Sequence, residues 1–206
     1  MLLIDIHTHN IDADPATAIL DSPPCYIGRK FSTGIHPWHI TSDWKEKLKT
    51  IEELLGNNSC VAIGECGIDK LKSTAEITLQ KEVFVAHALL AERLRLPLII
   101  HCVKAYEEIL AARKECNPTQ AWIIHGFRGK PQQADQLIRA GLHISFGEHF
   151  NPESARAIPT ERLFVESDES TLPILEIYSR VAAAKGTSVE QLATQIYSNA
   201  HSIGLF

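Results

Sequence analysis

Leu98-Ile99-Ile100-His101 is a run of three apolar residues that ends in a histidine. Val61-Ala62-Ile63-Gly64-Glu65 has a similar form and ends in a carboxylate. Uninterrupted apolar runs of this length are typical of strands that are buried on both faces of a parallel sheet. We therefore predict an α/β protein whose strands end in polar side chains.

Further segments of this kind alternate with helical patterns along the chain. Strands are predicted at residues 2–6, 17–21 (a weak pattern), 31–35, 60–64, 98–101, 122–125, 143–146 and 163–166. Helices are predicted at residues 41–55, 73–94, 105–116, 131–140, 172–184 and 188–197. About eight strands alternating with helices predict an α/β fold, a single distorted (β/α)₈ barrel of the TIM type.

The region of residues 10–30 departs from this alternation. It contains Pro15, Pro23 and Pro24 and shows no helical pattern, so the first β/α crossover is predicted to be reduced. A doubly wound open sheet is the alternative fold, but its first strand is usually followed by a glycine-rich phosphate loop. His7-Thr8-His9 occupies that place here, which favours the barrel.

The composition narrows the classes of protein that the chain can represent. No low-complexity tract or Gly/Ser linker divides residues 1–206, so we expect one domain. The net charge of −5 opposes indiscriminate binding of nucleic acid, although bound cations reverse such a field locally. The five cysteines include no C-x-x-C pair, which is typical of reduced thiols. With no secretory signal and no membrane-length apolar run, we expect a cytoplasmic location.

Histidines and acids follow the predicted strands. His7 and His9 stand at i and i+2 and therefore share one face of a strand. A single histidine or acid after a strand is more often a packed or salt-bridged residue than a metal ligand. Asp5, which precedes His7 by two residues, is better interpreted as a buried hydrogen-bonding acid. When several histidines and acids lie at the same end of a barrel, one divalent metal site can serve as the partner of all of them. The predicted ligands are His7, His9, Glu65, His101, His125 and Asp168.

This ligand set has enough carboxylate oxygens to hold two divalent ions, Mg²⁺, Mn²⁺ or Zn²⁺. Paired cations suit displacement at phosphorus, because they activate water and offset the charge on the leaving oxygen. Glu65 is predicted to bridge the ions or polarise the nucleophile, and Asp168 to orient or deprotonate the water. Cys66 and Cys102, beside Glu65 and His101, are interpreted as packing residues.

The order of these motifs resembles the TatD family of metal-dependent deoxyribonucleases, within the amidohydrolase-like barrels. The resemblance extends nearly from end to end, although residues 10–30 make the chain a short variant. The matching motifs are Asp5-Ile6-His7-Thr8-His9, Gly34-Ile35-His36-Pro37, Gly64-Glu65-Cys66-Gly67-Ile68-Asp69, Ile99-Ile100-His101, His125-Gly126-Phe127, Ile144-Ser145-Phe146-Gly147 and Glu166-Ser167-Asp168. The resemblance implies a distorted TIM barrel, the same six metal ligands and Mg²⁺- or Mn²⁺-supported cleavage of DNA, often from the 3′ end of single strands.

The sequence departs from the family pattern in the parts expected to contact substrate. Val103 occupies the place of the family's usual arginine, Arg128 that of a serine, and Glu169-Ser170-Thr171 follows Asp168. The predicted substrate contacts are Arg128, Lys104, His36 and Trp38. Arginine and tryptophan suit phosphate and nucleobase respectively.

Three functions compete at this point. The first is a phosphodiesterase whose partner is DNA, as single strands or 3′ ends. The second keeps the metal site but acts on a small phosphate ester, a lactone or an amide. The third is a non-catalytic protein whose metal stabilises an interaction surface. A membrane partner is not expected, and the sequence does not specify an oligomeric state.

Overall fold

A computed structural model describes residues 1–22, 28–55 and 59–206 of the chain. Pro23, Pro24 and Cys25 lie outside these residues. Eight strands form one sheet in their order along the chain, and every neighbouring pair is parallel. The strands are β1 (Asp5–Thr8), β2 (Ala18–Asp21), β3 (Lys30–Thr33), β4 (Cys60–Asp69), β5 (Leu98–Val103), β6 (Trp122–Ile124), β7 (His143–Phe146) and β8 (Leu163–Val165). All eight overlap predicted strands.

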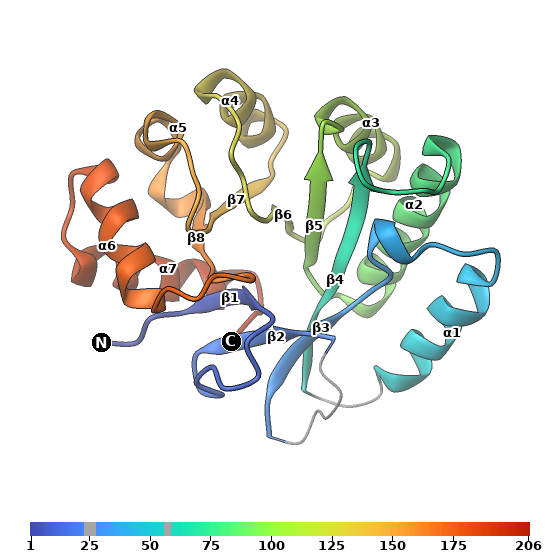
Figure 1. The fold of residues 1–206 in the computed structure, drawn as a ribbon, viewed down its shortest axis with the longest axis horizontal. Helices are drawn as coiled ribbons and strands as arrows, with labels where there is room; N and C mark the ends of the chain where they lie inside the picture. Colours follow the sequence, from blue (N-terminus) through green and yellow to red (C-terminus); the bar gives the residue numbers. More distant parts are fainter. Residues whose placement is uncertain (23–27, 56–58) are drawn as a thin grey trace.

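The first and last strands meet just beyond the end of β8. Thr8 and Asp168 form a parallel bridge, in which the amide of Asp168 donates to the carbonyl of His7 at 2.9 Å. The amide of His9 donates in turn to the carbonyl of Asp168 at 3.1 Å. This contact brings the two edges of the sheet together, and the helices lie around its outside (Figure 1). The predicted TIM-type barrel is therefore confirmed.

The helices follow the later strands. They are α1 (Trp44–Leu54), α2 (Ile77–Leu94), α3 (Tyr106–Cys116), α4 (Pro131–Arg139), α5 (Pro152–Ala157), α6 (Ile174–Lys185) and α7 (Val189–Ser202), with short 3₁₀ turns η1 (Pro37–His39) and η2 (Thr160–Arg162). Residues 9–17, between β1 and β2, contain turns and no helix. The reduced first crossover is thus confirmed, although the weakly predicted strand beside it is present as β2.

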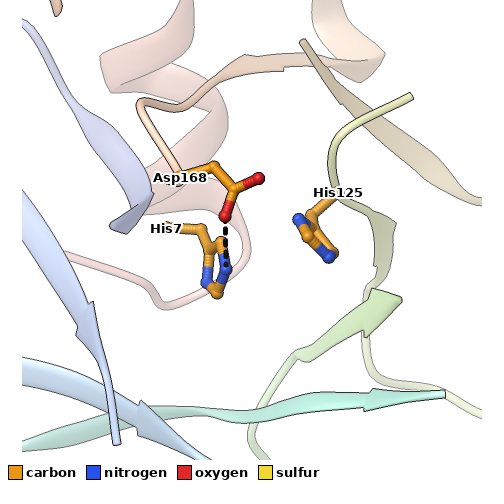
Figure 2. Close-up of side chains that lie close together, drawn as sticks. All are labelled: His7, His125 and Asp168. Atoms are coloured by element: carbon orange, nitrogen blue, oxygen red, sulfur yellow. Dashed lines mark ion pairs between the residues drawn. The ribbon is translucent and has the colours of Figure 1, made fainter. Parts of the chain in front are cut away.

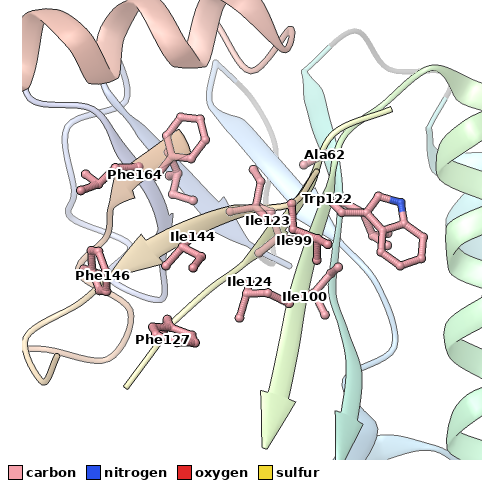
Figure 3. Packing of buried hydrophobic residues seen from close by; sticks show 14 of the residues in the cluster. Ala62, Ile99, Ile100, Trp122, Ile123, Ile124, Phe127, Ile144, Phe146 and Phe164 are labelled. Atoms are coloured by element: carbon pink, nitrogen blue, oxygen red, sulfur yellow. The ribbon is translucent and has the colours of Figure 1, made fainter. Parts of the chain in front are cut away.

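The sheet is buried on both faces. In β5 and β6, Ile99 pairs with Ile123 and Ile100 with Ile124, and all four side chains are fully buried. Figure 3 shows these isoleucines packed together with residues of the neighbouring strands. Trp122 packs edge to face against Phe84 of α2, with 5.3 Å between the ring centroids. The apolar runs of the sequence therefore form a rigid support for the residues that follow them.

One local prediction was wrong, and one short helix was missed. The strand predicted at residues 60–64 continues to Asp69, with a register shift against β5 between Ile63 and Cys66. Glycine is required on this path, because a Cβ on Gly64 would lie 2.5 Å from the carbonyl oxygen of Ile99. Such irregularities re-aim side chains beside functional sites. Glu65 consequently lies within a strand and not after one.

Helix α5 was not predicted because it has only six residues. It nevertheless has recognisable start signals. The Asn151 side chain accepts a hydrogen bond from the amide of Glu153 at 2.9 Å, and Pro152 occupies the first helical position.

A buried histidine makes the stability of this fold dependent on pH. His87 of α2 is fully buried, its Nε2 accepts from the amide of Ile35 at 2.9 Å, and its Nδ1 lies 2.8 Å from the carbonyl oxygen of Val83. Burial penalises the charged ring and lowers the pKa of His87 to about 4. The unfolded histidine titrates near 6.5, so the unfolded state binds more protons between these values. The contribution of neutral His87 to the free energy of unfolding is therefore complete above pH 6.5 and is lost as the pH falls toward 4.

We therefore expect the free energy of unfolding of chelator-treated protein to fall more steeply for the wild type than for His87→Gln. The difference should approach about 1 kcal/mol per pH unit between pH 6 and 5. Urea denaturation at several pH values measures it. Parallel curves for the two proteins would show that His87 does not titrate in this way.

Candidate metal centre and its cavity

The six predicted metal ligands meet at the carboxyl ends of the strands, with Glu65 at their centre. Oε1 of Glu65 lies 2.6 Å from His101 Nδ1 and 2.8 Å from His125 Nε2. Its Oε2 lies 3.3 Å from His7 Nε2 and 3.8 Å from His9 Nε2. The two oxygens of one carboxylate thus face different pairs of imidazoles.

Asp168 completes the cluster on the side of β1. Its Oδ1 lies 3.8 Å from His7 Nε2 and 3.7 Å from His9 Nε2. Figure 2 shows Asp168 against His7, with His125 facing them from the segment after β6. Because the backbone of Asp168 also joins β8 to β1, closure of the barrel places this carboxylate beside the His-x-His motif.

The donor set fits divalent metal ions. Three overlapping groups each have ligand atoms within 4.8 Å of one another: His7, His125 and Asp168; His7, His9 and Glu65; and His36, Glu65 and His101. His7 is fully buried, and neither of its ring nitrogens makes a hydrogen bond of good geometry within the described residues, although Nε2 lies 3.3 Å from Glu65 Oε2. A buried imidazole without such a partner is costly unless it binds an ion. Histidine and carboxylate donors together suit borderline divalent metals.

The electrostatics of the cluster also favour added positive charge. Burial penalises the charge of Glu65, but the surrounding imidazoles, first His125, outweigh this effect and hold the pKa of Glu65 well below its usual range. Burial likewise disfavours the charged form of His7, yet Glu65 raises its pKa to about 9. Protons and metal ions therefore compete for the same nitrogen atoms, so metal binding should release protons.

Two further acids in the same motifs hold the imidazoles from behind, and the sequence interpretation assigned no role to either. Asp69 Oδ2 lies 3.2 Å from His101 Nε2 and accepts from Trp38 Nε1 at 2.7 Å. Glu166 Oε1 lies 3.3 Å from His125 Nδ1. In both histidines this nitrogen is the one that does not face Glu65. Carboxylates in this position fix the ring and its tautomer.

We expect Asp69→Asn to weaken the affinity for Mn²⁺ by about 10- to 100-fold, as is typical when a supporting carboxylate is removed. Asp69 is 1% exposed, and burial disfavours its charged form, but four hydrogen-bond donors, Trp38 and His101 among them, outweigh this effect and lower its pKa to about 2. Isothermal titration calorimetry measures the effect. Glu148→Gln, which changes an acid outside the three metal groups, is the control. An unchanged Mn²⁺ affinity in Asp69→Asn would contradict this role.

A cavity of about 720 Å³ opens over the metal cluster and extends toward α1. Two of the predicted substrate contacts line it. His36 lies 3.2 Å from Glu65 Oε1 through its Nε2, which also places it among the candidate ligands. Trp38 is 40% exposed at the cavity wall, and its indole is held by Asp69.

The other two predicted substrate contacts lie elsewhere. Arg128 is exposed and lines a second, smaller cavity of about 260 Å³ on the far side of Asp168. The carboxylates of Glu148, Glu166 and Glu169 line this cavity too, so its charge suits a phosphate poorly. Lys104 is exposed and lines neither of these cavities, so its role stays a prediction from sequence alone.

The remaining interpretations concern residues beside the cluster. Asp5 accepts hydrogen bonds from the amide of Ser167 at 2.9 Å and from its hydroxyl at 2.6 Å, as expected of a buried hydrogen-bonding acid. Cys66 is fully buried in the core, whereas Cys102 is only half-buried. Both are free thiols, as are Cys60 and Cys116. None of the helices in the described part of the chain has the length and apolar character needed to cross a membrane.

A parallel barrel that collects histidines and carboxylates at the carboxyl ends of its strands defines a metal-dependent hydrolase of the barrel type. Within this class, the chain belongs to the family of TatD-related DNases, whose model matches residues 25–203. The family assignment from sequence motifs is therefore confirmed, and the protein is an enzyme of this hydrolase class.

Known relatives agree with this assignment. The 3′-5′ ssDNA/RNA exonuclease TatD of Erwinia amylovora is 29% identical over 200 residues, which cover 84% of this chain and 76% of that protein. The uncharacterized metal-dependent hydrolase YabD of Bacillus subtilis is 32% identical over 143 residues, covering 66% and 56%. The crystal structure of YJJV, a TatD homolog from Escherichia coli, has the same fold, with a TM-score of 0.84 over 99% of this chain and 98% of that chain at 18% identity.

Proposed function

We propose that the chain is a phosphodiesterase that cleaves single-stranded nucleic acid with water at a two-metal centre. The observation that carries this proposal is the position of Glu65. One of its oxygens faces His7 and His9, and the other faces His101 and His125. A carboxylate with this surrounding suits a bridge between two ions, which is the arrangement that promotes displacement at phosphorus.

The proposed ligands are His7, His9, Glu65, His101, His125 and Asp168. When bound, divalent ions lower the pKa of a water molecule and offset negative charge on the phosphate. The carboxylate of Asp168, at the edge of the cluster, would orient an attacking water and accept its proton. Asp69 and Glu166 keep the rings of His101 and His125 in place.

Nucleic acid is the proposed substrate because several relatives are named ssDNA/RNA exonucleases. The wall of the main cavity supports this choice, since Trp38 offers an exposed ring for a nucleobase and His36 a ring nitrogen for a phosphate. We further propose that Mg²⁺, Mn²⁺ or Zn²⁺ occupies the centre and that cleavage begins at a 3′ end.

The direct test is a cleavage assay on metal-free protein with and without each of these ions. Single-stranded oligonucleotides labelled at the 5′ or the 3′ end report the direction of cleavage. Small phosphate esters, lactones and cyclic amides are assayed in parallel. We expect metal-dependent shortening of single strands and little turnover of the lactones and amides. Metal-loaded protein that cleaves only the small esters would overturn the choice of substrate.

A further inference from the structure

The main cavity is larger than a phosphate group requires. From the metal cluster it extends across the ends of β2 and β3 to one face of α1. Ile35, Trp38 and Ile51 supply apolar surface on this side, and Thr50 and Lys47 border it on the helix. A phosphate bound at the metal centre would occupy only one end of this space.

Charge is distributed unevenly along the cavity. The acids in its lining come from β2, β4 and the segment after β8, namely Asp21, Glu65, Asp168 and Glu169. Lys47 is the one lysine or arginine among the described residues that line it, and it comes from α1. Figure 1 shows α1 on the side of the barrel away from β8. Lys47 therefore lies at the α1 end of the cavity, away from the segment after β8 that carries Asp168 and Glu169.

The indole of Trp38 lies in the wall of the same cavity and is held in a defined position. Its Nε1 donates to Asp69 Oδ2 at 2.7 Å, its ring meets that of His36 edge to face, and the ammonium of Lys72 lies 4.6 Å from its ring centroid. A fixed and exposed aromatic ring is a stacking surface for a base of any sequence.

From these observations we propose that the space under α1 is a nucleotide subsite, in which Lys47 binds the phosphate next to the one being cleaved. The base of that nucleotide lies against Trp38 and the neighbouring apolar side chains. This inference rests on the proposed function, because it assumes that a phosphodiester binds at the metal centre. It makes Lys47 a determinant of preference for longer strands.

The neighbours of Lys47 provide a variant that should act in the opposite direction. Lys47 Nζ lies 3.3 Å from Asp43 Oδ1 and donates to Thr41 Oγ1 at 2.5 Å. Lys47 and Asp43 are 43% and 56% exposed, so their ion pair is weak and easily exchanged for a substrate phosphate. Removing the charge of Asp43 would leave Lys47 free for that phosphate.

The test compares two thymidine oligonucleotides, TpT with one phosphate and TpTpT with a second. For Lys47→Met we expect the ratio of kcat/KM for TpTpT to kcat/KM for TpT to fall about tenfold, with a weaker dependence of TpTpT binding on salt. For Asp43→Asn the same ratio should rise. Lys45→Met is the matched control, because Lys45 lies on the same helix, pairs with Glu82 and does not line the cavity.

Each outcome decides between the two proposals. A ratio that is unchanged in Lys47→Met, in an enzyme that cleaves both oligonucleotides, would overturn the subsite and leave the proposed function intact. A wild-type enzyme that hydrolyses small esters but neither binds nor cleaves TpT would overturn the proposed function and the subsite with it. A fall in the ratio in Lys45→Met as large as in Lys47→Met would show a general effect of charge and also overturn the subsite.

Discussion

The Glu65→Gln variant is expected to lose metal binding and catalysis together. The substitution keeps the shape of the side chain and removes a negative charge that lies within 4 Å of all five imidazoles, those of His7, His9, His36, His101 and His125. The distances to His7, His36, His101 and His125 are 3.3 Å or less, and that to His9 is 3.8 Å. We expect the affinity for Mn²⁺ to fall by more than about 100-fold and kcat/KM by about 10³-fold or more.

Calorimetry with Mn²⁺ and cleavage of a single-stranded oligonucleotide measure the two losses. The fold should persist, because the core that supports the barrel does not depend on Glu65, and circular dichroism checks this point. Glu148→Gln serves again as a control for the loss of one acid near the site. Retention of wild-type activity in Glu65→Gln would remove the basis of the proposed mechanism.

The Asp168→Asn variant is expected to lose catalytic activity while it keeps the fold. The backbone of Asp168 joins β8 to β1, whereas its side chain points into the metal cluster, within 4 Å of His7 and His9. Its φ of 52° lies in the left-handed region, which asparagine tolerates better than most residues. The variant should therefore keep the closed barrel and its thermal stability.

For this variant we expect kcat to fall by about 10²- to 10⁴-fold, the range associated with loss of a general base. The loss of Mn²⁺ affinity should be smaller than in Glu65→Gln, because Asp168 lies within 4 Å of two imidazoles and Glu65 within 4 Å of five. Steady-state kinetics and calorimetry on the same preparation measure both quantities. A kcat within a factor of three of the wild type would assign the proton transfer to another group.

The sequence predicted the fold and the gathering of the six candidate ligands because each signal was local. His101 and His125 follow apolar runs, and such runs form neighbouring parallel strands whose ends must coincide. What the sequence did not predict depends on distant contacts. The strand was predicted to end at Gly64, and only the close approach of β5 explains why β4 continues through Gly64 and Gly67 to Asp69.

The supporting acids were missed for a different reason. Asp69 and Glu166 stand in the same motifs as Glu65 and Asp168. The motifs alone do not reveal which acid of each pair faces the metal site. That distinction arises from the direction of each side chain, and only the structure gives it. Lys104 illustrates the opposite case, in which proximity in sequence to His101 did not bring the side chain into either of the two cavities.

The central claim concerns the pairing of metal ions on Glu65, and anomalous diffraction from crystals soaked in Mn²⁺ tests it most directly. We predict two peaks about 3.5–4 Å apart, with the carboxylate of Glu65 between them. His7 and His9 should lie beside one peak, and His101 and His125 beside the other. A single peak that does not touch Glu65, or manganese bound only outside this group of histidines, would contradict the account.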